Sequence, residues 1–181
     1  MAGSTIGDSP KLKMVKNIGM ILFRGDLKSK TLQNALYEVT RVKVPIRGKI
    51  NSEGQLSVAW MSPDELLLFV PLKKARNLAE TLVKKIGDED TLIWDISDLR
   101  AVFEIEGNFI REVLAKNTPA DLSRDKMKKG VFRRTRFGQV AVAFWFESDT
   151  KWFLICRRSE AEYIKNLYEV STQFGEIPSF F

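Results

Sequence analysis

Residues 56–70, LSVAWMSPDELLLFV, hold the pattern that decides the fold. Two apolar runs, Leu56–Trp60 and Glu65–Val70, flank Met61–Asp64, in which proline stands at a position that β-turns favour. This arrangement predicts a hairpin of two strands. Residues 73–86 then place apolar side chains at helical spacing, so we expect the hairpin to lead directly into a helix.

The order of elements around this hairpin recurs when the sequence is shifted by about 86 residues. Leu56–Trp60 then falls on Val142–Phe146, and Leu66–Val70 falls on Trp152–Cys156. The alternative is a chance echo, because an apolar strand followed by an amphipathic helix is a common pattern. We predict the α+β fold class, with duplicated halves of strand, helix, hairpin and helix whose sheets merge around one core.

The predicted boundaries give one compact unit with a mobile tail at 1–12, a first α+β half at 13–90, a second half at 91–176 and an apolar C-terminal tail at 177–181. Further strands are expected at 18–23, 92–96, 101–105 and 131–136, and further helices at 28–39, 107–116 and from 159 onward. The buried core should contain residues of the proposed strands: Trp60, Leu67, Phe69, Ile93, Phe103, Val142, Phe144, Phe153 and Ile155.

The composition excludes several kinds of catalytic site. The 181 residues include no histidine and one cysteine, so a Ser-His-Asp triad, a Cys-His pair, an imidazole metal site and an internal disulfide are all excluded within this chain. Neither the dinucleotide-binding fingerprint nor the P-loop pattern is present. We therefore predict no catalytic, no cofactor-binding and no metal-binding residue.

The charge balance is basic, with 29 Lys and Arg against 23 Asp and Glu, a formal net charge of +6. This excess favours acidic partners but is modest for a dedicated nucleic-acid binder. No apolar run approaches the roughly 18 residues of a membrane span, and the first residues lack the pattern of a signal peptide. We expect a cytoplasmic protein with no membrane partner, for which a nucleic-acid partner is not favoured.

Two features suggest where a partner would bind. The densest basic segment is 124–136, where strand alternation predicts that Arg134 and Arg136 share one face. That face either binds an acidic partner or is simply a charged edge strand kept soluble. Phe180 and Phe181 end the sequence, and they either bury in a partner, dock on the chain itself or stay disordered. These four residues are the interface candidates.

Three polar side chains invite a chemical interpretation. Asp95 and Asp98 flank a short segment between two predicted strands, and paired carboxylates can serve acid–base catalysis. Aspartate also closes turns by accepting bonds from nearby backbone amides, which is the interpretation we favour. Cys156 lies within an apolar strand, where a buried structural thiol is the better interpretation.

Several short motifs follow one another over roughly residues 40–170. They are Arg47-Gly48, Trp60–Leu68, Asp95–Gly107, Arg111–Lys116 with Asp121-Leu122, and Arg157–Tyr163. Their order and spacing resemble the gamma subunit family of heterotetrameric sarcosine oxidase. That family is in turn similar to the folate-binding domain of the glycine-cleavage aminomethyltransferase. The resemblance implies the same duplicated α+β fold.

The resemblance also implies a function. It points to a non-catalytic structural subunit whose partners are the alpha, beta and delta subunits of sarcosine oxidase. Such a complex oxidatively demethylates sarcosine to glycine, forms peroxide and transfers the one-carbon unit to tetrahydrofolate. As the resemblance implies, FAD, FMN, NAD and tetrahydrofolate would be bound by the partner subunits and none by this chain.

One departure from the wider family bears on chemistry. The aminomethyltransferases carry an acidic residue that orients the reacting amine, and the matching stretch here has Ala141 and Val142 instead. The alternative function is a free-standing folate-binding protein, similar to an aminomethyltransferase or to a tRNA-modifying protein. That alternative requires another carboxylate, such as Asp95 or Glu104, in place of the missing one. An RNA-associated version would use the basic segment 124–136.

Overall fold

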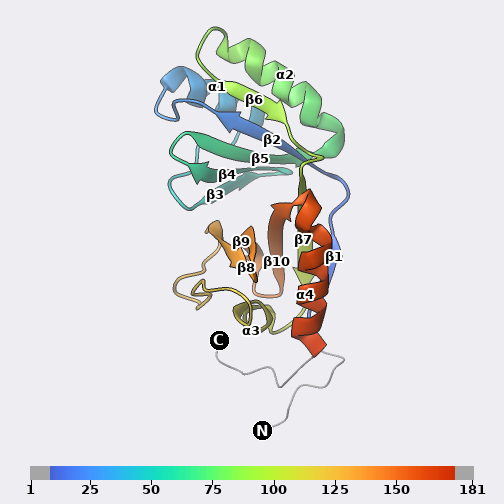
Figure 1. The fold of residues 1–181 in the computed structure, drawn as a ribbon. Coiled ribbons are helices and arrows are strands. Elements are labelled where there is room, and N and C mark those ends of the chain that lie inside the picture. Colours follow the sequence, from blue (N-terminus) through green and yellow to red (C-terminus); the bar gives the residue numbers. More distant parts are fainter. Residues whose placement is uncertain (1–8, 174–181) are drawn as a thin grey trace. The chain divides into compact units, whose positions relative to one another are not determined.

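The computed structural model describes residues 9–173, which divide into two compact units (Figure 1). The first unit is Lys16–Asp98, and the second combines the described residues up to Val15 with those from Leu99 onward. None of the helices within residues 9–173 is long and apolar enough to cross a membrane.

The first unit is a five-stranded antiparallel sheet in the order β3-β4-β5-β2-β6 with two helices. Helices α1 and α2 contact one another and pack on one sheet face, around a core that includes Leu32, Leu36 and Leu82. The elements are β2 Ile18–Arg24, α1 Lys30–Thr40, β3 Ile50–Glu53, β4 Leu56–Ser62, β5 Glu65–Pro71, a 3₁₀ turn at Leu72–Lys74, α2 Ala75–Ile86 and β6 Leu92–Asp95.

The second unit is also a five-stranded antiparallel sheet, in the order β1-β7-β10-β9-β8. Its core includes Phe103, Phe144, Trp152 and Ile164, all at most 1% exposed. The elements are β1 Lys11–Met14, β7 Arg100–Glu106, α3 Ile110–Ala115, β8 Arg133–Phe137, β9 Val140–Ser148, β10 Lys151–Arg157, a 3₁₀ turn at Arg158–Glu160 and α4 Ala161–Gln173.

The predicted duplication is confirmed by the topology. If β2 to β5 are matched with β7 to β10, the two sheets have the same strand order, and β6 corresponds to β1 at the edge. The pair β2 and β5 and the pair β7 and β10 are each in register along all seven residues. The burial pattern along β2 is identical to that along β7, and the pattern along β1 is identical to that along β6. The same scaffold is therefore built twice.

The edge strands correct the predicted boundaries. β1 precedes β2 along the chain but pairs with β7, whereas β6 precedes β7 but pairs with β2. The division at residue 90 is therefore wrong, because the first unit keeps β6 and extends to Asp98. The expectation of one compact unit with merged sheets around one core is also wrong, because the described residues form two sheets, each with its own core. The mobile tail at 1–12 is wrong for Lys11 and Leu12, which lie in β1. Residues 1–8 of that tail lie outside the described residues.

The predicted core residues are buried to different degrees. Leu67, Phe69, Phe103, Val142, Phe144 and Ile155 are buried, whereas Trp60, Ile93 and Phe153 are half-buried. Ile93 belongs to the edge strand β6, where one side of the residue has no neighbouring strand within the described residues.

Candidate functional site

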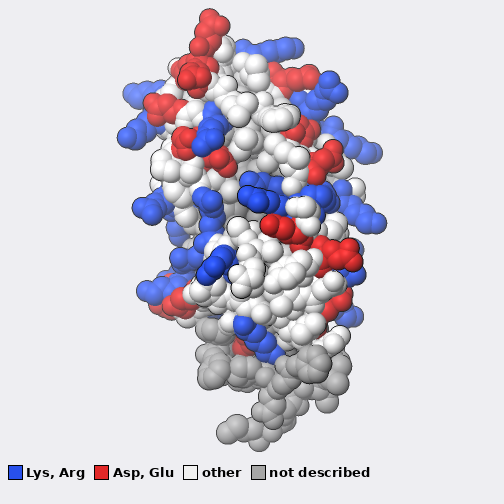
Figure 2. All heavy atoms as spheres, viewed as in Figure 1, with Lys and Arg blue, Asp and Glu red and all other residues white. Residues whose placement is uncertain are grey.

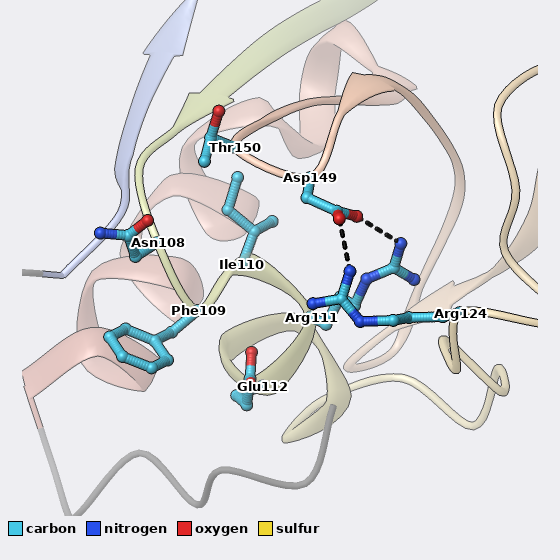
Figure 3. Close-up of a pocket in the computed structure, with 8 residues that line it drawn as sticks. All are labelled: Asn108, Phe109, Ile110, Arg111, Glu112, Arg124, Asp149 and Thr150. Atoms are coloured by element: carbon cyan, nitrogen blue, oxygen red, sulfur yellow. Dashed lines mark hydrogen bonds and ion pairs between the residues drawn. The ribbon is translucent and has the colours of Figure 1, made fainter.

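A pocket of about 240 Å³ lies at the start of α3 in the second unit (Figure 3). Its lining combines residues 108–112 with Arg124 and the β9–β10 turn residues Asp149 and Thr150. Phe109, directly before α3, has a φ of 61°, an uncommon backbone conformation for a bulky residue. In Figure 3 its ring points away from the two arginines, so the polar end of the pocket is formed by Arg111, Arg124 and Asp149.

Arg111 is the centre of the pocket's hydrogen bonds. Its guanidinium donates to the main-chain oxygens of Leu122 and Met127, and to Asp149 Oδ1 at 2.9 Å. The Arg111 side chain is only 6% exposed, and its two bonds to main-chain oxygens are buried. Arg111 therefore ties the long loop between α3 and β8 to the turn between β9 and β10.

Two aromatic rings complete the surroundings of this cation. The guanidinium carbon of Arg111 lies 4.8 Å from the ring centre of Trp152 and 5.3 Å from that of Phe146. A buried charge is costly unless it is paired, and ring faces and carbonyl oxygens replace part of the lost water. Arg111 Nε has no hydrogen-bond partner among the described atoms.

Asp149 is the acidic member of the pocket and is half-exposed. It accepts from Arg111 and, through its other carboxylate oxygen, from Arg124. The hydrogen bond from Arg111 is the main cause that holds the pKa of Asp149 below its usual range. A carboxylate engaged by two guanidiniums stays ionised near neutral pH and is a poor proton acceptor, so the arrangement is suited to holding a loop.

The basic segment predicted from the sequence leads from that loop into β8. Arg134 and Arg136 are exposed on one face of this edge strand, as the alternation predicts, whereas Arg133 is half-buried. Lys128 and Lys129 in the loop are also exposed. Figure 2 shows Lys and Arg side chains gathered over β8 and the preceding loop. The other two interface candidates, Phe180 and Phe181, lie outside the described residues.

Asp95, the last residue of β6, stabilises the turn that leads into β7. Asp95 Oδ1 accepts from both the backbone N–H (3.0 Å) and the hydroxyl of Ser97. Ser97 Oγ in turn accepts the buried N–H of Met20 at 2.9 Å. Asp98 is exposed. These bonds confirm the turn interpretation of Asp95.

The other candidates for chemistry are core residues. Cys156 is 1% exposed, and burial raises the pKa of its thiol to about 12, so the thiol is not poised to react. Of Ala141 and Val142, the two residues that the resemblance matches with the acidic segment of the aminomethyltransferases, Val142 is 6% exposed within the second unit's core and Ala141 is exposed. Within residues 9–173, no three His, Cys, Asp or Glu side chains gather as metal ligands would.

The sequence motifs gain a physical explanation from these contacts. The Arg111–Lys116 and Asp121-Leu122 motifs meet where Arg111 donates to Leu122, and Arg47 lies 6.0 Å from the ring centre of Trp60. Sequence reasoning did not identify the Arg111–Asp149 pair. The sequence did offer a signal that Arg111 is buried, because it lies in a short helix among the apolar residues Ile110, Val113 and Leu114.

Comparison with known proteins gives one matching family. Residues 24–172 match the model of the sarcosine oxidase, gamma subunit family. The sarcosine oxidase subunit gamma of Corynebacterium sp. (strain P-1) is 30% identical over 123 residues, which are 67% of this chain and 60% of that protein. That of strain U-96 is 31% identical over 107 residues, 59% of this chain and 51% of that protein. The matched region thus spans little more than half of these relatives.

Solved structures extend the comparison to the fold. The heterotetrameric sarcosine oxidase from Corynebacterium sp. U-96 includes a chain with a TM-score of 0.84 and 25% identity, and the match covers 93% of this chain and 88% of that one. The glycine cleavage system aminomethyltransferase T from Bartonella henselae matches with a TM-score of 0.61 and 11% identity, over 88% of this chain and 45% of that one. The second likeness concerns the fold alone.

Proposed function

Because this chain belongs to the sarcosine oxidase gamma subunit family, we propose that it is a non-catalytic structural subunit of a heterotetrameric sarcosine oxidase. The proposed complex oxidatively demethylates sarcosine to glycine, forms peroxide and passes the one-carbon unit to tetrahydrofolate. Its other members are alpha, beta and delta subunits, which bind FAD, FMN, NAD and tetrahydrofolate.

The observation that carries the non-catalytic role is the burial of Val142. An aminomethyltransferase-like reaction needs a carboxylate in this stretch to orient the amine, and here Ala141 offers only a methyl group while the isopropyl group of Val142 packs into the core. The carboxylates proposed as substitutes have other tasks. Asp95 closes a turn, and Glu104 is paired with Lys151 at 3.1 Å.

The proposed contact surface is the exposed face of β8 with Arg134 and Arg136, together with Phe180 and Phe181. Arginine and aromatic side chains dominate the energetics of many protein interfaces. The loop that leads into β8 is held by the buried Arg111, which lowers the entropy that a partner must remove on binding.

Co-expression with the larger subunits tests this function. The chain should co-purify with them, and a complex made without it should assemble poorly and lose sarcosine-dependent peroxide formation. The isolated chain should be colourless and should turn over no sarcosine. A flavin spectrum, sarcosine turnover or saturable tetrahydrofolate binding by the isolated chain would instead support the free-standing folate protein. Replacing Arg134 by Glu should weaken assembly, and more so at low salt.

A further inference from the structure

We propose that the outer edge of β6, with which no strand within residues 9–173 pairs, binds an extended strand of a partner subunit. The side chains of that strand would be apolar at alternate positions, and its ends would be basic. This inference rests on the proposed function, since it assigns part of the subunit contact. It begins from Leu92 and Trp94, which are 49% and 60% exposed on the same face of β6.

The duplication supplies an internal reference for these side chains. In the matched edge strand β1, the exposed positions that correspond to Leu92 and Trp94 are Lys11 and Lys13. Lysines on an edge strand oppose pairing with another chain, because adding a strand would bury their charges. β1 thus carries the usual protection, whereas β6 replaces both lysines by large apolar groups. An exposed apolar pair at an otherwise protected position indicates a binding surface.

The backbone of β6 is also available. Ile96 N–H donates to Met20 O, and in an antiparallel ladder the residues that bond to the neighbouring strand alternate. Leu92 and Trp94 therefore direct their N–H and C=O groups toward β2, and Ile93 and Asp95 direct theirs outward. No described strand pairs with that outer edge. A strand added there would bond to Ile93 and Asp95 and place apolar side chains beside Trp94.

Charge decides between a second copy of this chain and a different partner. Asp88 and Asp90 are exposed before β6, and Asp98 is exposed after it. In an antiparallel pairing of two β6 strands, the acidic end of one would meet the acidic end of the other. Arg24, the cation opposite Leu92 on β2, would not offset this repulsion, because it is already paired with Asp64 at 2.7 Å. The edge therefore fits a different chain with basic residues at its ends.

The test replaces the two exposed apolar side chains of β6 by the lysines found at the matching positions of β1. The double variant Leu92→Lys/Trp94→Lys should keep the melting temperature of the isolated chain, since both side chains are exposed, and should raise the dissociation constant for the co-expressed larger subunits at least tenfold. Val83→Lys is the matched control, because Val83 is 50% exposed on α2 of the same unit. The variant Asp88→Lys/Asp90→Lys reverses the charge of the segment before β6. It should also weaken assembly, by a smaller factor than the Leu92→Lys/Trp94→Lys variant.

Hydrogen exchange of the wild-type complex tests the strand itself and needs no variant. The amides of Ile93 and Asp95 should exchange quickly in the isolated chain and become protected in the complex, while those of Leu92 and Trp94 are protected in both. Unchanged exchange at Ile93 and Asp95, or normal assembly of the double lysine variant, overturns the inference alone. If the wild-type chain does not bind the larger subunits, the proposed function fails and this inference fails with it.

Discussion

The β4–β5 turn of the first unit and the β9–β10 turn of the second unit accept corresponding main-chain hydrogen bonds but carry different side chains. In the first, Gly25 N–H donates to Asp64 O at 2.9 Å, and in the second, Gly107 N–H donates to Thr150 O at 3.0 Å. Each bond joins the end of the strand before the first helix of the unit to the turn of the hairpin. The duplication has thus kept this main-chain hydrogen bond, although Gly107 has a positive φ and Gly25 does not.

The side chains at the two corners have diverged. Arg24 and Asp64 form an ion pair in which both partners are about half-exposed. In the second unit the cation is Arg111, whose side chain is 6% exposed and bonds to a long loop as well as to Asp149. The same scaffold therefore carries a solvated pair in one unit and a buried anchor in the other. A main-chain hydrogen bond can be retained while the energetic role of the side chains around it changes.

The largest effect should come from the cores of the two units. Phe144 in β9 and Val58 in β4 occupy matching positions, and both are 0% exposed. Phe144→Ala should cost about 3–5 kcal/mol of unfolding free energy, because a large cavity is left, whereas Val58→Ala should cost about 2 kcal/mol. Urea unfolding measures both. A loss below about 1 kcal/mol for Phe144→Ala would contradict the assigned sheet.

The two arginines test the divergence of the corners directly. Arg111→Met should cost about 2–4 kcal/mol, because the buried carbonyls of Leu122 and Met127 lose their donor. Arg24→Met should change the unfolding free energy little, since its exposed pair is replaced by water. Thermal or urea unfolding of both variants measures the difference. Equal losses would mean that Arg111 is not an anchor.

The two glycines test how closely each corner is packed. A Cβ on Gly107 would lie 2.8 Å from Pro10 Cα, and the φ of Gly107 is +134°, so Gly107→Ala meets backbone and is also strained. A Cβ on Gly25 would meet the side-chain methyl groups of Thr91 and Leu32, which can move. We expect a loss of about 2 kcal/mol for Gly107→Ala and less than about 1 kcal/mol for Gly25→Ala. Urea unfolding measures both losses of unfolding free energy. A larger loss for Gly25→Ala than for Gly107→Ala would contradict the closer packing expected at Gly107.

Much of the architecture could be predicted from the sequence because the spacing of apolar residues within short segments determines it. The hairpin at 56–70, its repeat and the helices that follow both hairpins depend on apolar residues close together in the chain. β1 and β3 were missed, because Lys11–Met14 and Ile50–Glu53 are four-residue strands with mostly exposed or half-buried side chains. The pairing of β1 with β7 and of β6 with β2 was also missed, since pairing between strands distant in the sequence leaves no local pattern.

The candidate site was predictable only where alternation governs it. The shared face of Arg134 and Arg136 follows from the period of a strand, and the structure has both exposed. The pairing of Arg111 with Asp149 joins residues from α3 and from the β9–β10 turn, and no spacing rule connects them. The motif that contains Arg111 marked the residue, but its partners required the fold.

The smallest effect should be the pH dependence of the two ion pairs. The pKa of Asp149 is lowered chiefly by its bond from Arg111, and that of Asp64 chiefly by its bond from Ser62 and next by that from Arg24. A carboxyl group whose pKa is lower in the folded state stabilises the fold above its unfolded pKa of about 3.9, and this contribution is lost as the pH falls through the folded pKa.

Asp149→Asn should therefore be less stable than the wild type at pH 7, and the difference should shrink as the pH falls below about 4, where the wild-type carboxyl also becomes neutral. Asp64→Asn should behave in the same way, with a smaller difference at pH 7, since Arg24 is exposed whereas Arg111 is buried. The urea midpoint between pH 7 and pH 3 measures both. The two carboxylates have different partners, so the double variant should show the sum of the single effects. A difference that stays constant over this range would mean that the charge of Asp149 does not stabilise the loop.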